Sequence, residues 1–304
     1  MSDAPRLVSV AMASYNGARY IAVQLDSIIH QTYSPLEIII VDDHSKDGTV
    51  AIVEGYQAKY PFIRLVRNEH NLGVTKTFEK AVGECKGAFI ALCDQDDIWE
   101  AEKIEILVNS IETYDAVFAD SLLVNDKDES LHRSFSDMMN LHSYHSGTPF
   151  LLSNSVPGHA MLLKADFLKG ILPFPEEIFF DLWIGFCAAA NNGIRYIDKT
   201  LVRYRQHDNN TVGTRESKNK KKRDPVAEQF AFKLRELQIL SAAPITDEST
   251  KKIMEQMIRH FHRRWSFARS AFFFKNCKEI LSSKKKPPFR KLLYCVKMFF
   301  KPNF

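Results

Sequence analysis

Residues 88–99 read AFIALCDQDDIW, an apolar run that ends in three closely spaced carboxylates. The run is typical of a buried strand, and Asp94, Asp96 and Asp97 follow where that strand should end. Like charges this close repel one another unless a cation neutralises them. Carboxylate oxygens suit Mg²⁺ or Mn²⁺, which keep coordination positions for phosphate oxygens. The segment therefore predicts a divalent cation that holds a phosphorylated ligand; a solvated acidic turn is the alternative interpretation.

A regular alternation of strands and helices surrounds this segment. Uniformly apolar runs predict strands at residues 7–13, 36–41, 62–66, 88–92 and 116–119. Apolar residues at helical spacing lie between them, at residues 21–29, 74–82 and 104–111. Strands joined by crossover helices predict an α/β fold with a mostly parallel central sheet flanked by helices. Ligands of such sheets bind beyond the carboxyl ends of the strands.

Polar clusters stand at those strand ends. Residues 14–17, Ser-Tyr-Asn-Gly, follow the first strand, and Asp42 and Asp43 follow the second. A carboxylate there can accept hydrogen bonds from a base or ribose, whereas Asp47 is interpreted as a cap for the helix that begins near Thr49. The chain contains neither a GxGxxG fingerprint nor a P-loop, which argues against nicotinamide binding and ATP hydrolysis.

One further carboxylate, Asp181, lies in the run from Phe179 to Ile184, which otherwise reads as a buried helix. Burying an unpaired charge is costly. Asp181 is therefore expected to be paired with a cation or retained for chemistry, with a helix N-cap as the alternative.

Composition limits the class of protein. With 304 residues, 45% of them apolar, the chain can bury a large core, and a main domain with an appendage is expected. Its five cysteines include no CxxC pair, which argues against a disulfide framework or structural zinc and favours a reducing cytoplasm. We expect neither a signal peptide nor a membrane-spanning helix, because no suitable leader and no apolar window of about 18 residues are found.

The net charge of +4 conceals a strong asymmetry. Residues 215–304 hold 23 Lys and Arg against 8 Asp and Glu, whereas the remaining chain holds 18 against 29. Residues 215–223, RESKNKKKR, are expected to form a loop. Apolar spacing at 230–237 and 253–265 predicts two helices that pack on the main domain.

The end of the chain combines positive charge with aromatic residues. Residues 259–301 hold 13 basic residues and the single acid Glu279. After two prolines, one helical face is expected to carry Phe289, Leu292, Leu293, Val296 and Phe300. Basic residues beside an apolar face suit the headgroup region of an anionic membrane. A basic aromatic tail can also bind nucleic acid, so a nucleic-acid-binding protein is an alternative function, and a non-catalytic nucleotide-sugar sensor is another.

Taken in order, the motifs over roughly residues 5–213 resemble the bacterial family 2 glycosyltransferases of GT-A fold, closest to rhamnosyltransferase-like enzymes of surface polysaccharide synthesis. The motifs that carry the resemblance are Ser14-Tyr15-Asn16-Gly17, Val41-Asp42-Asp43-His44-Ser45, Asn71-Leu72-Gly73, Asp94-Gln95-Asp96-Asp97-Ile98-Trp99, Leu172-Pro173-Phe174-Pro175, Asp181-Leu182-Trp183-Ile184 and Tyr204-Arg205-Gln206-His207.

The resemblance implies a catalytic domain at residues 1–213 and a basic helical region at 214–304. It implies inverting transfer from a dTDP- or UDP-sugar to a glycan acceptor carried on a lipid, with Mn²⁺ or Mg²⁺, in O-antigen or capsule synthesis. Asp181 would be the catalytic base, since inversion by single displacement needs only one carboxylate to take the acceptor's proton. Donor contacts would come from Ala13, Tyr15, Asn16, Asp42, Asp43, Asn71, Asp94 and Asp96. Metal ligands would be Asp96, Asp97 and His207.

Two positions depart from the family pattern. Relatives often carry His where this chain has Phe180, and a small or polar residue where it has His159. Both residues would lie near the acceptor. With the basic tail, the resemblance implies a cytoplasmic enzyme held at the inner face of the cell membrane, with no nucleic acid as partner.

Overall fold

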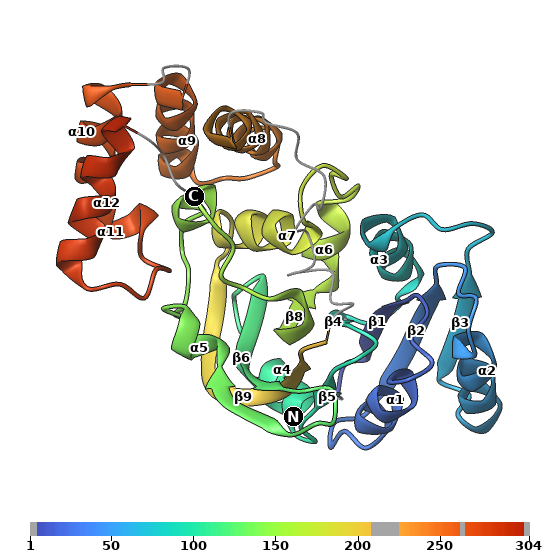
Figure 1. Cartoon of the computed structure of the whole chain (residues 1–304). Helices are drawn as coiled ribbons and strands as arrows, with labels where there is room; N and C mark the ends of the chain where they lie inside the picture. The colour runs from blue at the N-terminus through green and yellow to red at the C-terminus, as the bar shows by residue number, and fades with distance from the viewer. Residues whose placement is uncertain (1–4, 208–224, 262–264, 301–304) are drawn as a thin grey trace.

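A computed structural model of the chain describes residues 5–207, 225–261 and 265–300. Its centre is one curved sheet with helices on both sides (Figure 1). The strands are β1 (Val8–Ser14), β2 (Leu36–Asp42), β3 (Ile63–Arg67), β4 (Phe89–Cys93), β5 (Ile98–Trp99), β6 (Ala116–Val124), β7 (Ser130–Ser134), β8 (Met161–Lys164) and β9 (Ile194–Arg205).

The sheet has a parallel half and a mixed half. Its order is β3-β2-β1-β4-β8-β6-β9-β5, with β7 paired to β6. The first four strands in this order are parallel, whereas β8 runs antiparallel to both β4 and β6, and β9 runs parallel to β6. The mostly parallel α/β sheet predicted from the sequence is thereby confirmed.

Two apolar layers cover the faces of the sheet. One contains α1 (Ile21–Ile29), α2 (Thr49–Lys59) and α4 (Lys103–Ser110). The other contains α3 (Val74–Glu84), α6 (Ala165–Gly170) and α7 (Phe180–Ala189). Because both faces are covered, the inner parallel strands β1, β2 and β4 are mostly apolar. The edge strand β3 also carries Arg64 and Arg67. All five predicted strands and the three predicted helices of residues 7–120 are confirmed.

Residues 120–205 hold the elements that the sequence pattern did not reveal. The polar stretch at residues 126–146 predicts a loop with a short helix, and that helix is present as α5 (Phe135–Met138), but the strand β7 before it was missed. Its side chains are almost all exposed, so no apolar pattern marks it. Residues 201–204 by themselves predict a strand. Strand β9 is longer than this, because its polar first half pairs with β6 through a register shift near Asp120.

The helices after residue 224 pack on the second layer. They are α8 (Pro225–Leu240), α9 (Glu248–Phe261), α10 (Phe267–Lys275), α11 (Cys277–Ile280) and α12 (Pro288–Phe300). Leu237, Met257 and Phe273 are fully buried in the same apolar cluster as Phe186 of α7. The prediction that two helices pack on the main domain is confirmed, except that Trp265 lies beyond the end of α9 and is 65% exposed.

The basic loop predicted at residues 215–223 and the side chain of Phe300 lie outside the described residues. Within the described ranges, no helix combines the length and apolarity needed to cross a bilayer.

Candidate active site

Three loops that are far apart in the sequence meet at one edge of the sheet because their strands are parallel neighbours. Ser14 is paired with Asp42, and Met12 with Cys93. The loops after β1, β2 and β4 therefore begin side by side, at the edge where α/β sheets bind ligands.

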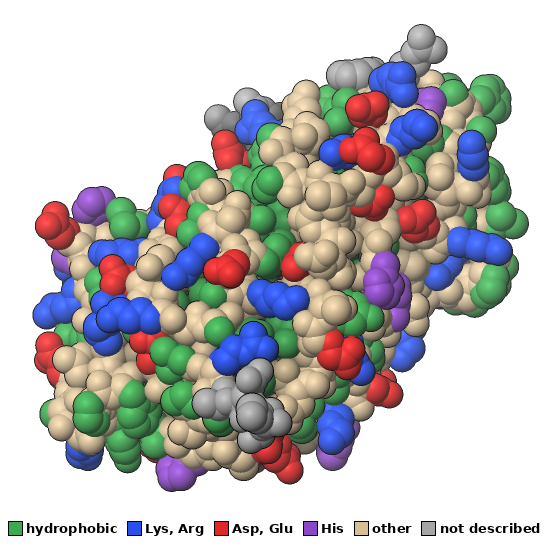
Figure 2. All heavy atoms as spheres, turned by 180° about the vertical axis from the view of Figure 1, so that it is seen from behind, with side chains coloured by type: hydrophobic (Ala, Val, Ile, Leu, Met, Phe, Trp, Pro, Cys, Tyr) green, Lys and Arg blue, Asp and Glu red, His purple; other side chains and the backbone are tan. Residues whose placement is uncertain are grey.

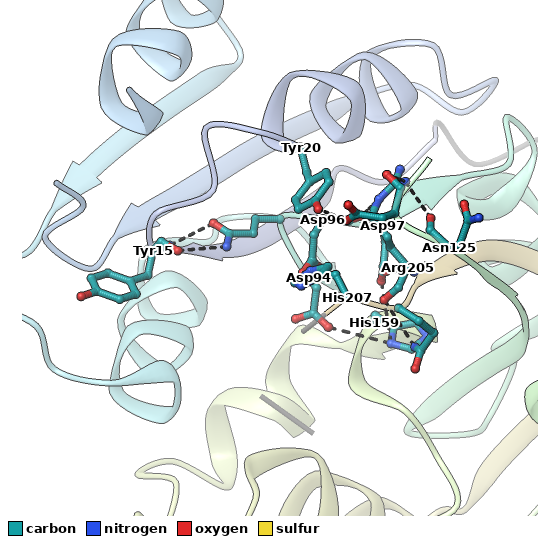
Figure 3. Close-up of polar contacts among 12 residues, drawn as sticks. Tyr15, Tyr20, Asp94, Asp96, Asp97, Asn125, His159, Arg205 and His207 are labelled. Carbon is teal, nitrogen blue, oxygen red and sulfur yellow. Dashed lines mark hydrogen bonds and ion pairs between the residues drawn. The ribbon is translucent and has the colours of Figure 1, made fainter. Parts of the chain in front are cut away.

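Tyr15 is tied to the acidic loop through Gln95 (Figure 3). Its main-chain N–H donates to Gln95 Oε1 over 3.0 Å, and the Gln95 amide donates to its carbonyl oxygen over 3.1 Å. A Cβ at Gly17 would lie 2.1 Å from Gln95 Oε1, so a larger residue there would displace the Gln95 side chain. The Tyr15 side chain is 47% exposed and Ala13 is half-buried, so both border open surface.

Asn16 and Asp42 shape the loops themselves. Asn16 takes a left-handed conformation with φ 48° and accepts a hydrogen bond of 2.8 Å from the N–H of Lys46. The buried Asp42 accepts bonds from the N–H of Ser45 (2.9 Å) and the hydroxyl of Ser14 (3.1 Å). The hydroxyl of Ser45 donates to the same carboxylate oxygen as the hydroxyl of Ser14, over 2.5 Å, so only the other oxygen, Oδ1, retains lone-pair capacity for a ligand.

Asp43 organises the loop after β3. It accepts hydrogen bonds from the side chain of Asn68 (2.9 Å) and from the N–H groups of Leu72 (2.7 Å) and Gly73 (2.8 Å). The side-chain amide of Asn71 donates to the carbonyl oxygen of Asp43 over 3.3 Å. The structure therefore brings the expected nucleotide-binding residues together around one set of loops.

The acidic loop meets a histidine that the sequence interpretation did not place there. Nδ1 of His159 lies 3.9 Å from Oδ2 of Asp94 and 3.8 Å from Oδ2 of Asp97. The three residues offer ligand atoms within 4.8 Å of one another. Donor atoms around a divalent cation stand about 3–4.3 Å apart when each lies about 2.1 Å from it, so the spacing fits such an ion.

Asp97 is the most constrained member of this group. One carboxylate oxygen accepts a hydrogen bond from the N–H of Arg205 over 3.1 Å. The other is buried and has no hydrogen-bond partner among the described residues. An unpartnered buried carboxylate oxygen is costly, and a bound cation would remove that cost.

Electrostatics favour neutral forms in this group when no cation is bound. Burial, with the charges of Asp96 and Asp94, raises the pKa of Asp97 well above its usual value. Burial, with the charges of Asp96 and Asp181, raises the pKa of Asp94 to about 7. Burial and the nearby Lys103 lower the pKa of His159 to about 3, so its imidazole is neutral.

Neighbouring groups set the orientation of His159. Its Nε2 lies 2.9 Å from the hydroxyl oxygen of Ser121. The tautomer that donates from Nε2 leaves the Nδ1 lone pair facing the carboxylates. The fully buried Lys103 donates to the carbonyl oxygen of His159 over 2.7 Å and lies 3.3 Å from the centre of the Trp99 ring.

Asp96 and His207 form a second pair beside this group. Nε2 of His207 lies 2.7 Å from Oδ2 of Asp96, and the imidazole stacks on Tyr20 at 5.1 Å. Arg205 donates from Nε to the carbonyl oxygen of Asp96 over 2.9 Å. The expected metal ligands thus lie in two adjacent groups, with Asp97 in one and Asp96 and His207 in the other (Figure 3).

Asp181 occupies the first turn of α7, next to the acidic loop. A Cβ at Gly158, the residue before His159, would lie 3.5 Å from the Cβ of Asp181. The carboxylate accepts a hydrogen bond from the N–H of Leu182 over 2.8 Å, and burial raises its pKa to about 6. Phe180 packs against Phe78, with ring centres 4.6 Å apart, and so lies in the apolar layer beside Asp181.

Three residues of the site were missed or given no role from the sequence. His159 and Lys103 lie outside the acidic run, and only tertiary contacts show that they adjoin it. For Arg205, the sequence feature that could have predicted a place in the site was its position between a strand and His207. An arginine that ends a strand beside a loop offers five N–H donors to the main-chain carbonyl oxygens of that loop.

The comparisons with known proteins agree with this geometry. The family model described as "Glycosyl transferase family 2" matches residues 9–172. An uncharacterized glycosyltransferase of Haemophilus influenzae is 28% identical over 231 residues, covering 69% of this chain and 68% of that protein. TuaG of Bacillus subtilis, whose name assigns it to teichuronic acid biosynthesis, is 37% identical over 105 residues, which is 34% of this chain and 42% of TuaG.

Two solved structures share the fold. TarS of S. aureus (residues 1–349), solved with UDP-GlcNAc, superposes with a TM-score of 0.61 at 21% identity over 96% of this chain and 80% of that one. The mannosyltransferase PcManGT of Pyrobaculum calidifontis, solved with GDP-Man and Mn²⁺, gives 0.53 at 20% identity over 96% and 79%.

The sheet, with the acidic loop at its carboxyl edge, has the GT-A fold. The chain belongs to glycosyl transferase family 2. None of the four proteins above is named a rhamnosyltransferase, so the comparisons do not bear on that part of the resemblance.

Proposed function

We propose that the protein is an inverting, metal-dependent transferase that moves a sugar from a UDP- or dTDP-sugar to a hydroxyl group of a glycan. The observation that carries the proposal is the buried, unpartnered oxygen of Asp97, which faces His159 at the carboxyl edge of the sheet. A second carboxylate, Asp181, stands beside that group, as a base for the acceptor must.

The donor would lie across the loops after β1, β2, β3 and β4. The residues that border this surface and would contact the nucleotide and ribose are Ala13, Tyr15, Asn16, Asp42, Asp43, Asn71, Asp94 and Asp96. The neighbours solved with UDP-GlcNAc and GDP-Man support a nucleoside diphosphate sugar as the donor class.

Mn²⁺ or Mg²⁺ would be held by Asp94, Asp97 and His159, whose ligand atoms already stand at suitable separations. The adjacent pair of Asp96 and His207 would meet the same cation and the donor diphosphate. A bound cation supplies stabilisation of the negative charge that develops on the leaving diphosphate. The neighbour solved with Mn²⁺ supports this assignment.

Asp181 would take the proton from the acceptor hydroxyl as that oxygen attacks the anomeric carbon. With a pKa raised to about 6, its carboxyl group is mostly ionised at neutral pH and is a stronger base than an exposed aspartate. Because the acceptor oxygen would attack the face of the sugar ring opposite the leaving diphosphate, the anomeric configuration would invert.

The acceptor is proposed to be a glycan carried on a lipid, in the synthesis of a surface polysaccharide such as O-antigen or capsule. The name of TuaG supports a role in polysaccharide synthesis. Residues 1–213 would catalyse transfer and residues 214–304 would hold the enzyme at the inner, cytoplasmic face of the cell membrane.

The first experiment measures thermal unfolding with UDP, dTDP or GDP, each with Mn²⁺ and with EDTA. A ligand at about 100 times its Kd adds roughly 2.7 kcal/mol, which raises the unfolding midpoint by several degrees. We expect a metal-dependent rise with UDP or dTDP. No rise with any nucleotide would overturn the proposal.

Two further measurements, of nucleoside diphosphate release and of nucleic-acid binding, separate the alternative functions. A non-catalytic sensor would show the metal-dependent shift with one nucleotide. When given a nucleotide sugar with the same base, it would release no nucleoside diphosphate. A nucleic-acid-binding protein would instead bind RNA or DNA with an affinity that falls steeply with salt and is indifferent to Mn²⁺.

A further inference from the structure

Helix α12 presents an exposed apolar face. Phe289 is 66% exposed, Leu292 54%, Leu293 49% and Val296 44%. Their spacing of three and four residues puts them on one side of the helix. These four residues are called the docking face below. Apolar side chains this exposed and this close together mark an interaction site.

The opposite side of α12 is firmly packed, which fixes the direction of the docking face. Cys295 and Met298 are fully buried. The buried guanidinium of Arg269 donates to the carbonyl oxygen of Met298 over 2.6 Å, and the hydroxyl of Ser270 donates to that of Cys295 over 2.8 Å. Because α10 holds α12 in this way, the docking face cannot turn inward.

Positive charge surrounds the docking face. Residues 265–300 contain nine Lys and Arg residues and one acid, Glu279. Arg290 and Lys297 flank the face on α12 itself, and the exposed Lys285 and Lys286 precede the helix. Figure 2 shows basic and hydrophobic side chains interspersed along the edge of the molecule formed by these helices.

Aromatic residues extend the apolar surface at the far end of α12. Phe267 is 79% exposed, and its ring centre lies 4.2 Å from that of Phe299. Trp265 beside it is 65% exposed. Trp and Phe at the end of a basic amphipathic helix are typical of segments that lie in the headgroup region of a bilayer.

We propose that the docking face of α12, with Trp265 and Phe267, binds the surface of an anionic lipid bilayer. Charge complementarity selects this occupant: apolar side chains enter the acyl boundary while the flanking Lys and Arg meet lipid phosphates. A second copy of the chain would bring the same excess of positive charge against itself. Nucleic acid would match the charge but would leave the aliphatic Leu292 and Leu293 without a function.

The docking face is connected to the candidate active site through α5. Lys285 donates to the carbonyl oxygen of Ser136 over 2.8 Å, and Met139 forms a β-bridge with Lys284. The ring of Phe135 at the start of α5 stands 6.5 Å from that of His159. These contacts join the segment that precedes α12 to α5, which borders the site. If the proposed transfer reaction holds, an acceptor on a lipid would approach along α5.

Flotation of the full-length protein with vesicles tests the inference. One set contains phosphatidylcholine alone and the other contains equal parts of phosphatidylcholine and phosphatidylglycerol. The test variant is Leu292→Glu/Val296→Glu, and the matched control is Leu131→Glu/Val23→Glu, whose parent side chains are 44% and 48% exposed on β7 and α1. All four positions are on the surface, so both variants should fold.

We expect the wild-type protein to bind the anionic vesicles, with an affinity that salt weakens. The affinity should fall about tenfold in the test variant and should not fall in the control. Equal binding of test variant and wild type would overturn the inference. So would a wild-type dimer that the test variant breaks, or binding to RNA in preference to vesicles. The thermal shift with nucleotide and Mn²⁺, measured on the same proteins, tests the proposed transferase separately, because it does not depend on lipid.

Discussion

Nδ1 of His159 lies 3.8 Å from Oδ2 of Asp97, an oxygen that no hydrogen-bond donor of the described residues reaches. A neutral imidazole nitrogen and a carboxylate oxygen cannot bond directly at that separation. Both atoms can bind one cation between them. The protein therefore retains a locally unfavourable arrangement where a metal would make it favourable, which is typical of a functional site.

Replacing Asp97 by Asn should stabilise the metal-free protein while abolishing its response to metal. The amide oxygen can still accept the bond from the N–H of Arg205, and the buried carboxylate is gone. We expect a gain of about 1–2 kcal/mol, which raises the unfolding midpoint in EDTA by a few degrees. Asp115→Asn is the control, because the buried Asp115 accepts two bonds from Asn192 and its substitution should destabilise. A fall in the midpoint for Asp97→Asn would contradict the prediction.

The stabilising effect of Asp97→Asn should depend on pH. Below about pH 4 the carboxyl group is protonated in both folded and unfolded chains, so the gain is small. Above pH 4 the unfolded chain ionises, whereas burial keeps the folded carboxyl group protonated. The wild type therefore loses stability relative to the variant as pH rises from 4 towards 7. Unfolding midpoints in EDTA at several pH values measure this difference, and a difference that is constant with pH would count against it.

The two histidines can be separated by matched substitutions. His159→Gln should weaken Mn²⁺ binding in the presence of nucleotide more than His207→Gln does, because His159 already stands among Asp94 and Asp97 while His207 is paired with Asp96. Loss of one ligand or its partner typically costs 10–100-fold in affinity. Calorimetric titration with Mn²⁺ gives both values. The reverse order would support the ligand set expected from the sequence: Asp96, Asp97 and His207.

Asp181→Asn should reduce turnover without reducing donor binding. Removal of a general base costs about 10²–10⁴-fold in rate, and the hydrogen bond that the Asp181 carboxylate accepts within α7, from the N–H of Leu182, does not involve the nucleotide loops. The wild-type rate should rise with pH through about 6 and then level off, since the carboxylate form is the base. The exposed Asp166→Asn at the start of α6 is the control. Full activity of Asp181→Asn would refute the assigned role even if the metal-dependent nucleotide shift persisted.

The elements of the first half of the chain could be predicted because each is marked by a local pattern. Strands β1, β2 and β4 are mostly apolar, since both faces of a parallel sheet are covered. Strand β7 is exposed and pairs only at an edge, so its formation depends on β6 rather than on its own residues. The same holds for the polar first half of β9.

The sequence by itself determined the α/β class, the acidic run at the end of β4 and the isolated carboxylate of Asp181, because periodicity and charge spacing are properties of neighbouring residues. Only the tertiary structure decided which side chains meet. It brought His159 against Asp94 and Asp97, and it paired His207 with Asp96. Contacts between residues some 60–110 positions apart depend on how the sheet and its loops fold together. No local pattern carries that information.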